Sequence, residues 1–176
     1  MNIFYLHPNA QVCAEMHCDA HVVKMLLEYA QLLSTAHREL DGDDFRADNA
    51  GFYKATHKNH PSAVWVRKSR SNYRWVHSLL LGVCEQYTQR YGRVHKTQSS
   101  GVVEALSRCP IHLSIGYFTA PPLCMPDEYK AVDVVDAYRD YYIGEKLYKK
   151  DGKPMAKWSY SERPKWANSN HEGSGI

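Results

Sequence analysis

The clearest pattern of hydrophobic and polar positions lies in residues 17–37, HCDAHVVKMLLEYAQLLSTAH. This segment reads as a helix that is apolar almost all the way round, which is typical of a buried helix. At ~100° per residue, however, its polar side chains fall within one narrow stripe. The stripe consists of His17, His21, Lys24, Glu28, Gln31 and Thr35. A core helix that keeps ionisable side chains in one line needs a physical reason.

Local signals predict further helices. Asn9 is placed to cap a helix over residues 10–17, and Asp19 is a second candidate cap, so this helix either continues or breaks near Cys18. Other predicted elements are a strand or extended segment over 1–6, a helix from Pro61 to residue 91 that Gly92 ends, a short helix over 99–109, and a helix over 126–143 that Gly144 ends.

These elements predict a mainly α fold: a compact, single-domain helical bundle with long ordered loops. The domain covers residues 1–167, and a disordered tail follows over 168–176. Residues 39–56, rich in Asp, Gly and Asn, and the proline-rich residues 110–126 are the expected loops. The Asp-Gly pair in KKDGKP is also compatible with a short β-hairpin near the C-terminus.

Composition narrows the class of protein. The 176 residues are 44% hydrophobic and 23% charged, as in soluble globular domains. No apolar run approaches ~18 residues, and the N-terminus lacks the zones of a signal peptide. Five cysteines without a CxxC pair suit a reduced, cytoplasmic protein. The net charge of +3 is compatible with nucleic-acid binding, but dedicated nucleic-acid-binding modules are often more basic. The basic residues nevertheless cluster over 67–74 and 146–157.

The polar stripe has three interpretations. In the first, the stripe is a buried network whose polar groups are all hydrogen-bonded, or it is the solvent-facing edge of the helix, and Lys24 and Glu28 form an ordinary ion pair. In the second, it lines a cleft and does chemistry, since buried ionisable groups are costly and their perturbed pKa values suit acid–base work. In the third, His17 and His21 share a metal ion, although HExxH and zinc-finger spacings are lacking and Lys24 would repel a cation. We favour the cleft, and we expect neither a metal nor a cofactor.

Within the stripe, Glu28 and Lys24 carry the most chemistry. A carboxylate in a partly dry cleft holds or relays a proton, and a desolvated lysine becomes a nucleophilic amine. Together they suit attack on a sugar C1′ or on a carbonyl carbon. The predicted catalytic residues are therefore Glu28, Lys24 and His21.

A second region suggests ligand binding. Before Pro61, Asn59 or His60 is an ordinary helix cap, but the free N–H groups of a helix N-terminus also bind phosphate or carboxylate. RKSRSNYRW and YRDYYIGEK then interleave cations with aromatic rings, which clamp phosphates and stack bases. The predicted substrate-binding residues are His17, Gln31, Asn59, His60, Arg67, Asn72, Tyr73 and Tyr142.

Several motifs resemble one known family. They are HCDAHVVKMLLEYAQLLSTAHR, HKNHPSAVWVRKSRSNYRWV, CEQYTQRYGRVHKT, MPDEYK, AYRDYYIGEK and ERPKWA. Together they resemble small phage and bacterial proteins labelled pyrimidine-dimer DNA glycosylase-like, which are distantly similar to the phage endonuclease V type of glycosylase. The resemblance spans roughly residues 1–167.

The resemblance implies an all-helical enzyme that flips a base out of DNA and forms a Schiff base between an amine and C1′. It implies that Glu28 is the acid–base residue, with His21, Lys24 and Arg67 near the phosphates and YKKDGKPMAKWSY gripping the DNA. The related enzyme uses the amine of a small residue exposed by loss of the initiator methionine. Here Asn2 disfavours that loss, so the amine role passes to Met1 or to Lys24, of which we favour Lys24.

Two functions follow from the sequence. The first is a DNA-directed enzyme that cuts or alters the glycosidic bond of a damaged or modified pyrimidine nucleotide in a duplex. The second is a protein that binds a free or signalling nucleotide with little or no catalysis, as a phage counter-defence protein would. The sequence is silent on the oligomeric state.

Overall fold

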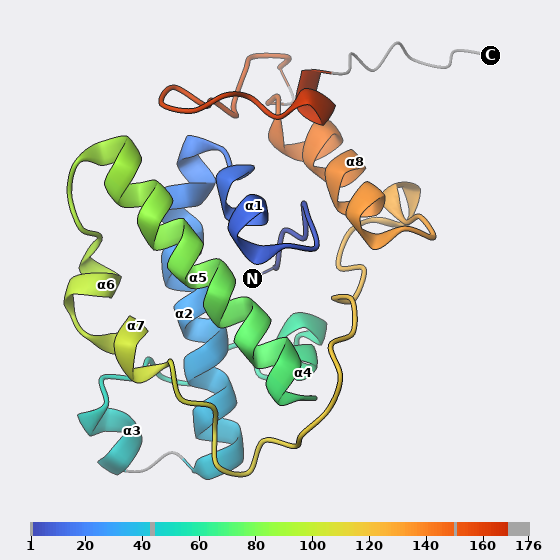
Figure 1. Cartoon of the computed structure of the whole chain (residues 1–176). Helices are drawn as coiled ribbons and strands as arrows, with labels where there is room; N and C mark the ends of the chain where they lie inside the picture. Colours follow the sequence, from blue (N-terminus) through green and yellow to red (C-terminus); the bar gives the residue numbers. More distant parts are fainter. Residues whose placement is uncertain (1, 43–44, 150, 169–176) are drawn as a thin grey trace.

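The computed structural model describes residues 2–42, 45–149 and 151–168 (Figure 1). The described residues form one compact, mainly helical domain, as the sequence predicts. In chain order its elements are α1 (Ala10–Glu15), α2 (Asp19–Asp41), α3 (Phe45–Asn49), α4 (Pro61–Val66), α5 (Arg70–Tyr91), α6 (Lys96–Ser99), α7 (Val102–Ala105), the 3-10 turn η1 (Asp127–Tyr129), α8 (Val134–Lys146) and the 3-10 turn η2 (Lys165–Asn168).

The long helices α2 and α5 cross at the centre of the domain, and α1 packs on α5 (Figure 1). They bury their apolar faces against each other, and removal of this apolar surface from water is the main force that holds a helical bundle together. Large side chains of both helices are fully buried there, including Leu26, Tyr29 and Leu33 of α2 and Leu79 and Leu80 of α5.

The N-terminal helix breaks at Cys18, one of the two outcomes the sequence allows. Cys18 has extended backbone angles and precedes α2, so Asp19 is the first helical residue and not the cap. The guanidinium of Arg90 in α5 holds this break together. It donates to the carbonyl oxygens of Glu15 at 3.0 Å and His17 at 2.8 Å, and to the Asp19 carboxylate at 3.1 Å. The orphan carbonyls at the end of α1 thereby gain partners.

The predicted helix over 61–91 is two helices. The interruption is at Ser69, whose backbone is extended. The Ser69 hydroxyl accepts from the backbone N–H of Asn72 at 3.1 Å, so Ser69 caps a new helix, α5. The predicted stop is confirmed. Gly92 adopts φ +63°, the left-handed conformation that glycine accepts at no steric cost, and ends α5.

The last long helix starts later and ends later than the sequence predicts. Residues 127–129 form only the turn η1, and the side chain of Asp133 caps α8 by accepting from the N–H of Asp136 at 3.0 Å. The helix continues past Gly144. A Cβ at this glycine would collide with the Tyr129 ring, so the glycine permits close packing and does not end the helix.

The predicted loops are correct in part. Within 39–56, α2 runs on to Asp41 and α3 adds a short helix, whereas 110–126 contains no helix or strand. At the position of the possible hairpin, one isolated antiparallel bridge joins Tyr148 and Pro154, and the Gly152 N–H donates to the carbonyl oxygen of Lys149 at 2.8 Å. Of the predicted tail over 168–176, only Asn168 is among the described residues, and it is the last residue of η2.

Two further findings concern the chemistry of the whole chain. All five cysteines are free thiols. Among the described residues, no helix has the length and apolar character that crossing a membrane requires.

Candidate functional site

The break at Cys18 leaves His17 outside α2 and its polar stripe, and the remaining stripe divides into buried and surface parts. His17 and Thr35 are buried, His21 and Gln31 are half-buried, and Lys24 is exposed. The Thr35 hydroxyl accepts from the backbone N–H of Thr56 at 3.2 Å, so this end of the stripe is covered by the segment after α3. The stripe is therefore not exposed along its whole length.

His17 belongs to the core. Its Nδ1 lies 2.7 Å from the carbonyl oxygen of Cys13, which can only accept, so Nδ1 carries the proton. Its Nε2 then accepts from the Tyr29 hydroxyl at 2.7 Å. Burial lowers the pKa of His17 to about 4, so the ring is neutral at pH 7 and both of its nitrogens are occupied within the chain.

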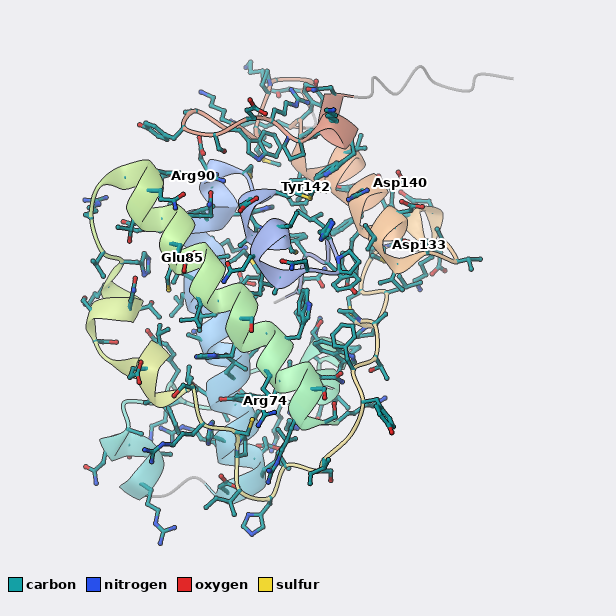
Figure 2. The ribbon with its side chains drawn as sticks, viewed as in Figure 1. Arg74, Glu85, Arg90, Asp133, Asp140 and Tyr142 are labelled. Atoms are coloured by element: carbon teal, nitrogen blue, oxygen red, sulfur yellow. The ribbon has the colours of Figure 1, made fainter. Side chains whose placement is uncertain are left out.

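His21 is held in a similar way. Its ring stacks on Phe4 with centroids 4.5 Å apart, and its Nδ1 lies 2.5 Å from the Tyr142 hydroxyl. That hydroxyl accepts from the backbone N–H of Cys18 at 3.0 Å, so Tyr142 projects from α8 to the start of α2 (Figure 2). Burial lowers the pKa of His21 to about 3. A ring that stays neutral down to this pH supplies no proton at neutral pH.

Lys24 and Glu28 form the exposed part of the stripe. The Lys24 Nζ lies 3.1 Å from Oε1 of Glu28, one turn further along α2. The side chain of Lys24 is 68% exposed, whereas that of Glu28 is 16% exposed. The pair thus joins an accessible amine to a carboxylate that is largely shielded from water.

Lys24 also lines a surface hollow of about 600 Å³. The apolar part of its wall comes from Val23 and Leu27, two exposed apolar residues of α2. The opposite wall comes from residues far along the chain: Gly51, Tyr53, His95, Lys96, Thr97 and Ser100. The hollow is within the 300–1,000 Å³ range of small-molecule sites, and it combines an apolar bed with two lysines.

The sequence did not single out the far wall of this hollow. His95 caps α6, because its Nδ1 accepts from the backbone N–H of Thr97 at 3.1 Å, and burial lowers the pKa of His95. The Tyr53 hydroxyl donates to the Thr97 hydroxyl at 3.2 Å, which ties the segment after α3 to α6. His95, Lys96 and Thr97 end the motif CEQYTQRYGRVHKT, but the sequence gives them no site role, because only the packing of α6 beside α2 brings them to Lys24.

The residues before α4 form a separate group. His60 is the cap of this helix, and its Nδ1 accepts from the N–H of Ser62 at 3.2 Å, while Asn59 is exposed. Burial lowers the pKa of His60. Arg67 donates from one nitrogen to the carbonyl oxygen of Lys58 at 2.8 Å, and its other terminal nitrogen is buried with no hydrogen-bond partner among the described residues.

Asn72, Tyr73 and Tyr142 are buried in the core. The Asn72 side chain donates to the carbonyl oxygen of Trp65 at 3.0 Å and accepts from the N–H of Thr119 at 3.0 Å. The Tyr73 hydroxyl donates to the carbonyl oxygen of Leu106 at 2.9 Å, and burial raises its pKa. These side chains support the fold from inside, so we do not include them in the proposed site.

A second hollow, about 550 Å³, lies at the C-terminal end of α2 beside His37, Asp41 and Arg108. Asp41 accepts from the backbone N–H groups of Ile111 at 2.8 Å and His112 at 3.1 Å, so its carboxylate is used to fix the following loop. Along α2 it is roughly 25 Å from Lys24, at 1.5 Å per residue. The two hollows are separate.

No group of three His, Cys, Asp or Glu side chains converges to hold a metal ion within residues 2–42, 45–149 and 151–168. Comparison of the chain with known protein families, with curated proteins and with solved structures finds no match. The resemblance to the glycosylase-like family stays a hypothesis from the sequence motifs.

Proposed function

We propose that this protein is a DNA-directed enzyme that acts on a damaged or modified pyrimidine nucleotide through amine chemistry of the glycosylase and abasic-site lyase type. The observation that carries the proposal is the 3.1 Å pair of Lys24 and Glu28 at the rim of the hollow beside α2. Lys24 is the nucleophile and Glu28 accepts its proton. His21 in α2 and His17 just before it, both neutral and hydrogen-bonded to tyrosines, hold the start of the helix that carries the pair.

The chemistry needs an unprotonated amine beside a proton acceptor. Once Glu28 has taken a proton from Lys24, the amine nitrogen adds to C1′ of an abasic sugar in its aldehyde form. Water leaves from the resulting carbinolamine, and an iminium ion links Lys24 to the sugar. On an intact nucleotide the same attack breaks the bond from C1′ to the base, which leaves with the bonding electrons and then takes up a proton.

The hollow supports this assignment by its size and lining. Val23, Leu27 and Tyr53 present an apolar and aromatic surface of the kind on which an extruded base rests. Lys96 adds a second cation within reach of a phosphate group. The alternative amine, that of Met1, lies outside the described residues.

Borohydride trapping tests the proposal. The full chain is incubated with oligonucleotides that carry an abasic site, a thymine dimer or a hydroxymethylated pyrimidine, and borohydride then reduces any iminium to a stable amine. We expect a covalent adduct that Lys24→Arg abolishes, because arginine keeps the charge and lacks the primary amine. Glu28→Gln should slow adduct formation roughly 100-fold or more, the usual effect of losing a general base.

Lys130→Arg is the matched control, since this lysine is also exposed and paired with an acidic side chain, Asp127. It should trap as well as the unaltered chain. An adduct that persists in Lys24→Arg would move the amine elsewhere, and peptide mapping would show whether it is Met1. No adduct on any substrate would exclude the amine mechanism.

A second candidate function is binding of a free nucleotide without catalysis. The hollow favours it, because a site of about 600 Å³ with a tyrosine and two lysines suits one base and its phosphates. A thermal-shift screen with free and cyclic nucleotides tests it. Stabilisation that Lys96→Ala removes and that depends weakly on salt would support this function, since several phosphate contacts with DNA give a steep salt dependence.

A further inference from the structure

The segment 113–119 is an extended loop that the start of α5 holds rigidly. It runs beside α4 and the N-terminal end of α5 (Figure 1). Four hydrogen bonds join it to three consecutive residues: the Arg70 N–H to the Ser114 oxygen at 3.0 Å, Arg70 Nε to the Leu113 oxygen at 3.1 Å, the Ser71 hydroxyl to the Gly116 oxygen at 2.6 Å and the Ser69 hydroxyl to the Tyr117 oxygen at 3.2 Å.

The far end of the loop is fixed as well. Trp65 Nε1 donates to the carbonyl oxygen of Thr119 at 3.1 Å, and the Asn72 side chain accepts from the Thr119 N–H at 3.0 Å. At Gly116 the backbone approaches so closely that an added Cβ would lie 3.0 Å from the Ser69 Cβ. The loop therefore has little freedom to turn its side chains inward.

Two large apolar side chains nevertheless point into solvent from this fixed backbone. Ile115 is 87% exposed and Tyr117 is 94% exposed, whereas Leu113 in the same loop is 2% exposed. Leu113 packs inward, whereas the bonds to α5 hold the backbone so that Ile115 and Tyr117 lie outward. Exposed apolar residues presented on a rigid backbone mark an interaction surface more strongly than scattered ones.

The segment that carries these two side chains and the segment that holds it are both basic in sequence. Residues 49–84 contain no Asp or Glu, and residues 105–126 contain none either. The cations in the first segment are Lys54, Lys58, Arg67, Lys68, Arg70 and Arg74. Arg74 is exposed on α5 (Figure 2), one turn beyond Arg70, whose side chain touches the loop, and Lys68 is exposed in the link before α5. In a chain with a net charge of +3, these two segments thus contribute cations and no carboxylates of their own.

We propose that Ile115 and Tyr117, together with Lys68, Arg70 and Arg74, form a docking surface for duplex DNA. This inference rests on the proposed function for the choice of DNA over other polyanions. The cations bind backbone phosphates, and the Tyr117 ring, which no residue of the loop covers, packs against bases that it unstacks. Charge complementarity with a polyanion favours DNA over an apolar protein partner.

The experiment measures binding of a fluorescently labelled duplex of about 20 base pairs to the full chain by anisotropy over a series of salt concentrations. Tyr117→Ala should weaken binding about 5- to 100-fold, as expected for loss of one stacking side chain. Arg74→Ala should lower the slope of log affinity against log salt by about 0.9, the value for one phosphate contact. Both side chains are exposed, so neither change should unfold the domain.

Matched controls come from other exposed positions. Val132→Ala removes a fully exposed apolar side chain, and Arg93→Ala removes an exposed arginine beyond the end of α5. Both should bind like the unaltered chain. A 2-aminopurine base in the duplex should brighten on binding as it unstacks, and Tyr117→Ala should abolish this signal.

The outcomes separate this inference from the proposed enzyme. Lys24→Arg should bind the duplex normally even though it traps no adduct. If no substrate is trapped but Tyr117→Ala and Arg74→Ala weaken binding, the docking surface stands and the enzyme does not. If the chain binds no duplex at low salt, or both variants bind like their controls, the surface is overturned. Binding to anionic lipid vesicles that Tyr117→Ala weakens, with DNA binding unchanged, would also overturn it.

Discussion

The hydroxyl groups of Tyr29 and Tyr142 decide the state of two histidines in this fold. His17 and His21 each have a tyrosine oxygen within hydrogen-bond distance, and burial keeps both rings neutral at pH 7. Residues that a sequence pattern marks as ionisable are here neutral packing partners. In the function that we propose, acid–base chemistry is therefore assigned to Glu28 beside Lys24.

Burial of these histidines predicts how stability depends on pH. An unfolded histidine has a pKa near 6.5, and His17 has about 4 in the fold, so between these values the unfolded chain binds more protons. Stability from His17 is therefore complete above pH 6.5 and is lost as the pH falls towards 4, by roughly 3 kcal/mol at 1.36 kcal/mol per pKa unit.

Denaturant unfolding of the unaltered chain and of His17→Gln between pH 7 and pH 4.5 checks this. The free energy of unfolding should fall less steeply on acidification in His17→Gln, because glutamine does not titrate. Carboxylates contribute equally to both slopes. Equal slopes in the two proteins would show that His17 is not kept neutral by the fold.

At the scale of helices, close approach decides where glycine is needed. Gly82 lies in the middle of α5, where glycine costs ~1 kcal/mol relative to alanine. A Cβ at this position would lie 2.8 Å from the Cβ of Ala14 in α1. The contact between α1 and α5 is therefore set by the absence of a side chain at residue 82.

Gly82→Ala should destabilise the protein by about 1–3 kcal/mol, the usual cost of overpacking, despite its better helix propensity. The exchange Ala14→Gly with Gly82→Ala restores the missing space and should recover part of the loss. Thermal unfolding of the single and double variants measures both effects. A single variant that is more stable than the unaltered chain would contradict this packing.

At the scale of the whole molecule, the C-terminal third is tied to the start of α2. Tyr142 reaches from α8 to Cys18 and His21, and Trp158 donates to the carbonyl oxygen of Met16 at 3.2 Å. The N–H of Asp19 donates to the carbonyl oxygen of Lys157 at 2.8 Å. Segments more than a hundred residues apart thus share one hydrogen-bonded junction, which suits a domain that unfolds as a unit.

Tyr142→Phe should cost about 1–3 kcal/mol, because the Cys18 N–H and the His21 ring lose a buried partner. Hydrogen exchange should then show the most protected amides of α2, α5 and α8 losing protection together. Tyr148→Phe, at an exposed tyrosine of the following segment, should change little. Loss of protection confined to α8 would instead show that α8 docks as an independent unit.

The sequence by itself determined what depends on local chemistry. The helical class, the cap at Asn9, the start at Pro61 and the stop at Gly92 follow from side chains and backbone angles within a few residues, and the structure has them all. The Lys24–Glu28 pair is equally local, because residues four apart on a helix are neighbours.

Only the tertiary structure decided what covers each part of the stripe. Periodicity shows which face of α2 is polar, but Tyr142, 121 residues beyond His21, and the α6 wall opposite Lys24 come from distant segments. The same holds for the exposed Tyr117, whose carbonyl oxygen accepts from the hydroxyl of the distant Ser69. The burial of a side chain and the identity of its hydrogen-bond partner are decided by the packed molecule, because they depend on which distant segments exclude water from that side chain.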